Sequence, residues 1–465
     1  MRYLILLSTL ITSAFAASFG PRFEEIKRTA KPAEFYTFLY ALPKGGDLHN
    51  HLGGAIRSEW WYDVATDPKR NGGDVFYTRV KFTAGIDTGT PLILFQTIRQ
   101  HTYDALPPAK QADFVRLDSL SAEQKQAWLD SVRLDRPGEG RNEFFEWIWP
   151  RLGGLFGNLD VINNVTVETM KAYGAEGMRY LETQTSVMGY ADNAGNPISP
   201  KDAADAIRRR LAQPDAVATG VTVRFQVTGL RFFPDAEQQV ERLYQFVDAN
   251  RDLWVGINLA GIEENGKGYP LRFLEIFREM RRKYPTLALS IHAGEMDGPD
   301  AHIRDTLLLG ASRIGHGVNL IKDPDTLLLL QQTRRVLVEI NLISNRLLEY
   351  TPDLAKHPFP EYLRTGVPVC LNTDDRGMWD SNLTDEYYTA VTNFNLSWDE
   401  LISMGRNSIT YSFAQPELKA RLLADYDAAV AAFEAKYAGS LASLKDVKPV
   451  TYGYAKRTWG FVFAP

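Results

Sequence analysis

The chain has 465 residues, of which 45% are hydrophobic and 23% charged, and this composition is typical of a soluble globular protein with a large core. Its formal net charge of −5 argues against a nucleic-acid-binding protein, because neutralising phosphates requires a basic surface. The single cysteine, Cys370, excludes an intrachain disulfide and a cysteine-rich zinc cluster.

The N-terminal segment has the pattern of a secretory signal. Arg2 is followed by a short apolar stretch over residues 3–15, and Ala14-Phe15-Ala16 forms an A-x-A cleavage sequence. This pattern predicts a signal peptide over residues 1–16, with an uncleaved membrane anchor as the alternative. The remaining residues, 17–465, are then a single domain that is secreted or periplasmic and has no membrane contact after cleavage.

Short apolar runs alternate with amphipathic stretches along most of the chain. Eight runs read as strands, at residues 45–52, 177–187, 221–230, 253–261, 287–292, 313–320, 336–342 and 367–373. Helical periodicity lies between them, over residues 200–211, 235–250, 271–284, 300–309 and 323–333. Eight repeats of strand and helix predict an α/β fold, the (β/α)8 TIM barrel.

Two regions fall outside this alternation. Residues 60–140, after the first strand, contain turn sequences and weak periodicity, and we expect an insertion of loops and helices. Residues 401–406 and 417–437 predict a C-terminal helical extension, and the aromatic tail over about 440–465 is expected to pack on the surface.

Four histidine- or aspartate-containing motifs end predicted strands, and in a parallel barrel those ends converge on one mouth. His49 and His51 are two residues apart, so both side chains project from the same face of a strand. With His292 and Asp374 they supply three imidazoles and a carboxylate, which suit one catalytic Zn²⁺ per chain. Such an ion lowers the pKa of a water molecule to about 7.

Other polar residues at these strand ends are free to handle protons. Glu295 follows His292 across Gly294, so its carboxylate can lie beside the metal without binding it and can shuttle a proton. His316, between two glycines, can orient and deprotonate the attacking water. Asp375 points away from its neighbour Asp374 and can hydrogen-bond to substrate.

The remaining aromatic and histidine positions have no distinct pattern. Trp147 and Trp149 are consistent with a roof over a purine or with ordinary core packing. The other three histidines are expected to be surface or structural residues: His101, His302 and His357.

Taken together, these motifs resemble the adenosine deaminase family of amidohydrolase-type barrels. The matching pieces are Pro43 to His51, Leu259-Ala260-Gly261, His292-Ala293-Gly294-Glu295, Arg313 to Gly317 and Asn372-Thr373-Asp374-Asp375. The resemblance extends over about residues 40–425. The signal sequence, the early insertion and Ile343-Ser344-Asn345 are most similar to its secreted, growth-factor-related branch.

The resemblance implies zinc-dependent, hydrolytic deamination of adenosine or a related adenine nucleoside to the inosine-type product and ammonia. In this interpretation Glu295 protonates the purine N1 and His316 assists the attacking water. Asp375 contacts N7, and the backbone of Gly261 contacts N3. Many members carry an acidic residue that touches the ribose two places after the second metal histidine, but here that position is Gly53.

Two alternatives remain open on the sequence. The same centre could hydrolyse another aminated heterocycle or a cyclic amide, since a fold does not fix a substrate. The chain could instead be a non-catalytic extracellular nucleoside-binding or signalling protein. The sequence does not specify the oligomeric state or the residues of the sugar pocket.

Overall fold

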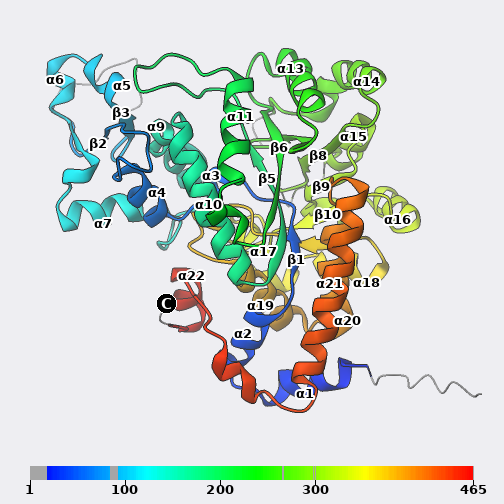
Figure 1. Cartoon of the computed structure of the whole chain (residues 1–465). Helices are drawn as coiled ribbons and strands as arrows, with labels where there is room; N and C mark the ends of the chain where they lie inside the picture. The colour runs from blue at the N-terminus through cyan, green and yellow to red at the C-terminus, as the bar shows by residue number, and fades with distance from the viewer. Residues whose placement is uncertain (1–17, 84–92, 264–265, 297, 299, 464–465) are drawn as a thin grey trace, which may run out of the picture.

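The computed structural model describes residues 18–83, 93–263, 266–296, 298 and 300–463. Eight parallel strands form one sheet at the centre of the molecule, with helices on its outside (Figure 1). The strands are β1 (Gly45–Asp47), β5 (Met178–Thr185), β6 (Thr222–Leu230), β7 (Trp254–Ala260), β8 (Ala288–Ala293), β9 (Arg313–His316), β10 (Leu337–Ile340) and β11 (Val369–Leu371). Each strand coincides with a predicted apolar run, which confirms the (β/α)8 TIM barrel.

The barrel closes between its first and last strands through irregular backbone. Neighbouring strands pair in chain order from β1 to β11, and an isolated parallel bridge joins Asn50 to Asp374. The N–H of Asp374 donates to the carbonyl of His49 at 2.9 Å. The strand predicted over 45–52 is therefore shorter than expected, because β1 ends at Asp47 and the histidines follow it in non-ladder backbone.

Helices cover the outer face of the barrel. They are α10 (Leu159–Ala175), α11 (Pro200–Leu211), α13 (Ala236–Ala249), α14 (Leu274–Lys283), α15 (His302–Leu309), α16 (Pro324–Thr333), α17 (Leu342–Leu347), α18 (Phe359–Thr365), α19 (Leu383–Phe394) and α20 (Trp398–Thr410). In α13, Val240, Leu243 and Val247 recur at helical spacing and are buried against the sheet. All seven residues of β7 are buried, as expected for a parallel strand covered on both faces.

The insertion between β1 and β5 lies to one side of the barrel and contains a small sheet that the sequence did not predict (Figure 1). Three antiparallel strands form it: β2 (Phe76–Arg79), β3 (Thr97–Arg99) and β4 (Phe114–Arg116). These strands of three or four residues are too short to show an alternating pattern. Helices α4 (Ser58–Ala65), α5 (Gln100–Asp104), α6 (Pro108–Gln111) and α7 (Ala122–Ser131) accompany the sheet, and the short helices α8 (Trp149–Arg151) and α9 (Gly153–Phe156) follow it.

The first and last helices of the described chain pack beside the barrel rather than over its site. Helices α1 (Gly20–Thr29) and α2 (Pro32–Ala41) precede β1, and α21 (Pro416–Tyr437) and α22 (Gly453–Trp459) follow the last barrel helix. The aromatic tail packs on α2 and α19, with Phe461 5.4 Å from Tyr36 and Trp459 4.7 Å from Tyr388, measured between ring centroids.

Within the described ranges no helix has the length and apolarity that crossing a membrane requires. The signal peptide predicted over residues 1–16 lies outside the described residues and stays a prediction.

Candidate active site

The residues singled out in the sequence come together at the carboxyl ends of the strands. His292 lies in β8, His316 ends β9, and Asp374 lies three residues beyond β11. His316 and Asp374 have φ angles of 66° and 53°, the left-handed region that non-glycine residues rarely adopt. Such a conformation costs of the order of 1–3 kcal/mol and is kept where the surrounding structure fixes it, commonly at functional sites.

Four side chains converge on one point of the mouth. The Nε2 atoms of His51 and His292 are 3.2 Å apart. Asp374 Oδ1 lies 3.6 Å from His49 Nε2 and 3.4 Å from His51 Nε2. The four predicted metal ligands therefore all offer an atom to the same small space.

The donor atoms fit a bound divalent cation. His49 Nε2 and Asp374 Oδ1 are buried and have no hydrogen-bond partner among the described residues, although burying unpaired polar atoms is costly. Glu339 Oε2 lies 2.7 Å from His49 Nδ1, which places the ring proton on Nδ1 and leaves Nε2 free to coordinate. Ser344 Oγ donates to Asp374 Oδ2 at 2.6 Å and holds the other oxygen of that carboxylate. Neutral imidazoles and a carboxylate are the ligands of a catalytic zinc site.

The charges of these groups are set by burial and by one another. Burial lowers the pKa of His292 well below its ordinary value and that of His51 to about 4, so both rings are neutral. For His49, burial acts in the same direction, but the carboxylates of Asp374 and Glu339 outweigh it and raise the pKa to about 10. Without a cation this ring therefore also carries a proton on Nε2, and an ion bound there would replace that proton. The Asp374 carboxyl, although buried, has a lowered pKa because the adjacent imidazoles of His49, His316 and His51 stabilise its charged form.

Glu295 is held beside this point by a second buried acid, Glu263. The N–H groups of Gly294 and Glu295 donate to the two oxygens of Glu263, each at 2.9 Å. Burial and the negative charge of Glu263 raise the pKa of Glu295 to about 8. Glu295 is therefore protonated at neutral pH and available as an acid.

Glu263 also contacts one of the histidines that the sequence assigned no role. His302 Nδ1 lies 2.7 Å from Glu263 Oε1, and that carboxylate raises the pKa of His302. The His302 side chain is half-buried and lies against Glu263, which positions Glu295.

His316 belongs to a chain of hydrogen bonds whose direction can be followed. The backbone N–H of Phe359 donates to His357 Nδ1 at 3.1 Å, so the proton of neutral His357 is on Nε2. His357 Nε2 then donates to Asn345 Oδ1 at 3.1 Å, and Asn345 Nδ2 donates to His316 Nδ1 at 3.1 Å. Burial lowers the pKa of both histidines to about 3, so both are neutral. His316 therefore carries its proton on Nε2, 3.6 Å from Glu295 Oε1.

The His316 ring also lies close enough to coordinate an ion. Its tautomer nevertheless distinguishes it chemically from the four predicted ligands. A protonated Nε2 is a hydrogen-bond donor and cannot bind a cation.

Asp375 and Gly261, predicted to contact substrate, lie on opposite sides of the mouth and line the same cavity. Burial and the adjacent charge of Asp374 raise the pKa of Asp375. A side chain at Gly54 would overlap the Asp375 carboxylate, and Gly261 has a φ of 111° and packs under the ring of Phe232. Both glycines are therefore required by close contacts at the site.

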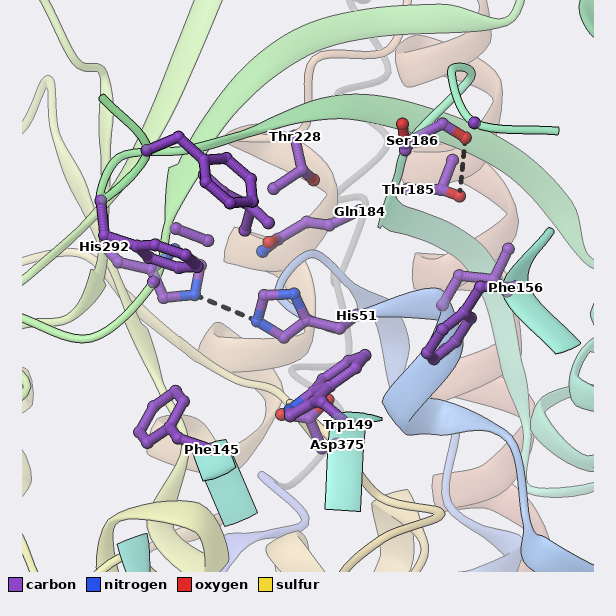
Figure 2. Close-up of a pocket in the computed structure, with 18 of the residues that line it drawn as sticks. His51, Phe145, Trp149, Phe156, Gln184, Thr185, Ser186, Thr228, His292 and Asp375 are labelled. Carbon is purple, nitrogen blue, oxygen red and sulfur yellow. Dashed lines mark hydrogen bonds between the residues drawn. The ribbon is translucent and has the colours of Figure 1, made fainter. Parts of the chain in front are cut away.

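The cavity above these residues has a volume of about 780 Å³. Figure 2 shows His51 and His292 at its centre, Phe145 and Trp149 on one side, and Gln184 and Thr228 on the other. A cavity of this size accommodates a ligand considerably larger than a free nucleobase.

Sequence reasoning missed four buried residues that support the site: Glu263, Glu339, Asn345 and His357. Glu339 could have been identified because it is a charged residue inside the apolar run 336–342. Glu263 could have been identified because it lies three residues after the carboxyl end of β7, where the functional residues of a parallel barrel gather. Asn345 and His357 carry no such local pattern, since their role depends on a turn that brings them together.

Imidazoles and carboxylates at the carboxyl ends of a (β/α)8 barrel, around a space for a cation and beside a protonated acid, define a hydrolase of the amidohydrolase type. The model of the Adenosine deaminase family matches residues 142–429. The chain therefore belongs to the adenosine deaminase family and is a hydrolytic deaminase of the adenosine and adenine type. His49 and His51 precede the matched residues, and the structure brings them to the same site.

Individual relatives agree with this assignment. An adenine deaminase of Chelativorans sp. (strain BNC1) is 33% identical over 262 residues, which cover 55% of this chain and 75% of the relative. An adenosine deaminase of Pseudoalteromonas translucida (strain TAC 125) is 29% identical over 272 residues, 58% of this chain and 78% of the relative. The fold is similar to that of an amidohydrolase from Burkhoderia ambifaria solved with bound Zn, with a TM-score of 0.61 and 20% identity over 87% of this chain and 95% of that one. Placement in the growth-factor-related branch stays a prediction.

Proposed function

We propose that this deaminase acts on adenosine or a closely related adenine nucleoside and uses one zinc ion, held by His49, His51, His292 and Asp374. The observation that carries the proposal is the pair of buried, unpartnered atoms, His49 Nε2 and Asp374 Oδ1, the second of which belongs to a residue that lines a cavity large enough for a nucleoside. The bound ion would supply Lewis-acid chemistry and a water molecule of lowered pKa.

The chain's own residues hold the substrate and move the proton. Glu295 donates its proton to the purine N1 as water adds to C6, takes up the proton that the water oxygen releases, and passes it to the amino group, which leaves as ammonia while N1 keeps its proton in the inosine-type product. The Nε2–H of His316 donates to the oxygen of the attacking water and fixes its direction. Of the two roles expected from the sequence, orienting the water and deprotonating it, the tautomer favours the first. Asp375 and the backbone of Gly261 would contact N7 and N3.

A deaminase assay tests the proposal directly. Purified, zinc-loaded protein should release ammonia from adenosine and shift the ultraviolet spectrum of the purine, and adenine, deoxyadenosine and methylthioadenosine serve as competing substrates. Adenine is the second candidate, favoured by the names of two of the relatives. The proposal is wrong if no adenine nucleoside is deaminated, whether or not ammonia is released from adenine.

A swap of Asn345 to aspartate tests the direction of the hydrogen-bond chain. Asn345→Asp keeps the shape of the side chain, but it replaces the nearer of the two amide donors at His316 Nδ1 by an acceptor, the other being Asn341 Nδ2 at 3.3 Å, and so favours a proton on Nδ1 over one on Nε2. We expect kcat to fall by roughly 10²-fold or more, because the water loses its donor. Nitrogen NMR of labelled histidine should show the change of tautomer.

The exposed residue Asn393 provides the matched control, and Asn393→Asp should leave both measurements unchanged. Full activity of Asn345→Asp together with an altered His316 tautomer would show that the donor has no role.

A further inference from the structure

We propose that Gln184, assisted by Thr228, is the sugar-recognising residue of this enzyme and binds neighbouring ribose hydroxyls in place of the missing acid at position 53. This inference rests on the proposed function and deepens it. It concerns the part of the cavity that extends from His51 along the ends of β5 and β6.

Gln184 is a buried amide without a structural partner. Its side chain lines the cavity, the residue is 2% exposed, and neither Oε1 nor Nε2 makes a hydrogen bond to any described residue. Buried polar atoms are nearly always hydrogen-bonded because leaving them unpaired destabilises the fold, so this amide requires an explanation. Figure 2 shows the amide directed toward the space beside His51.

The position of Gln184 is fixed by its backbone rather than by its side chain. Its N–H donates to the carbonyl of Asn50 at 2.9 Å, and it forms a parallel bridge with His51. Thr228, on the adjacent strand β6, also has a buried hydroxyl with no hydrogen-bond partner within the described part of the chain. Two rigid strands thus present three unpaired polar atoms to one space.

The expected contacts of the purine nitrogens place the sugar beside the ends of β1, β5 and β6. Around the barrel mouth, Asp375 follows β11, and then come β1, β5, β6 and finally Gly261 after β7. Around the purine, N9 lies between N7 and N3 on the edge away from N1. With N7 at Asp375 and N3 at Gly261, the substituent on N9 therefore faces β1, β5 and β6.

Two aromatic rings across the proposed sugar space from Gln184, those of Phe156 and Trp149, explain why position 53 is a glycine. A Cβ atom there would overlap the ring of Phe156 and lie 3.2 Å from the ring of Trp149. These two rings stack with centroids 5.7 Å apart and leave no room for an acidic side chain. The sugar is then bound between an aromatic face and the Gln184 amide, which can both donate to one hydroxyl and accept from the next.

Paired changes in enzyme and substrate test the assignment. We expect wild-type protein to deaminate adenosine with a kcat/KM at least tenfold above that of 2′,3′-dideoxyadenosine, because the unpaired amide disfavours a sugar without hydroxyls. Gln184→Leu should reduce this ratio to near one, mainly by lowering kcat/KM for adenosine, and Thr228→Val should reduce it partly. The exposed residue Gln245 is the control, and Gln245→Leu should keep the wild-type ratio.

A thermal melt distinguishes recognition from a structural role. Because leucine removes two unpaired buried atoms, Gln184→Leu should have a Tm equal to or above that of wild type. An unchanged substrate ratio in Gln184→Leu, with or without a lower Tm, would overturn the inference while the proposed function stands. Failure of wild-type protein to deaminate any nucleoside would overturn both.

Discussion

Replacing Glu295 by glutamine should lower kcat for adenosine by roughly 10³-fold, within the 10²–10⁴-fold range typical of general acid–base catalysis. The amide has nearly the same shape but no proton that it can transfer to N1. Its position should be unchanged, because the loop is held by the bonds from Gly294 N–H and Glu295 N–H to Glu263. KM should therefore change much less than kcat.

Steady-state kinetics of Glu295→Gln beside Glu275→Gln check this result, since Glu275 is exposed on α14 and remote from the cavity. Wild-type kcat in the Glu295 variant would remove this residue from the proton transfer. A large rise in KM at constant kcat would instead make it a binding residue.

Removing the cation should have an effect of similar or larger size. Extended treatment with a chelator should lower activity by at least about 10³-fold, since a Lewis acid contributes several kcal/mol and each 1.36 kcal/mol is tenfold in rate. One equivalent of zinc should restore the activity. His292→Ala should have the same loss without restoration, because it removes one of the three imidazoles.

The control for this substitution is His101→Ala, which changes a partly exposed histidine of the insertion that does not line the cavity. Elemental analysis should find about one zinc per chain in wild type and in His101→Ala, and much less in His292→Ala. Full activity in protein shown to be metal-free would contradict the proposed role of zinc.

The barrel was predictable because its parallel strands are buried on both faces and its helices are amphipathic. The seven buried residues of β7 form a largely apolar run, and the buried face of α13 gives apolar residues at helical spacing, so both elements can be recognised in the sequence. The small sheet of the insertion could not be recognised, because its short strands are stabilised by pairing with one another and contain no long apolar run.

The candidate site divides in the same way. Residues that end strands, such as His292 and Asp374, were predictable because the fold itself brings them to one mouth. Asn345 and His357 were not, since a hydrogen bond between two side chains has no periodicity. The tautomer of His316 follows from a backbone N–H at Phe359, which no sequence pattern reveals.

The two rings that occupy the space beside Gly53, Trp149 and Phe156, come from the connection between β1 and β5 rather than from the barrel. The space proposed for the sugar is therefore bounded by two parts of the polypeptide: this connection supplies the aromatic wall, and the strands β5 and β6 supply the polar groups of Gln184 and Thr228. Exchanging the part of this connection that follows His51 between homologues should change the aromatic wall while the proposed metal ligands and Gln184 remain in place.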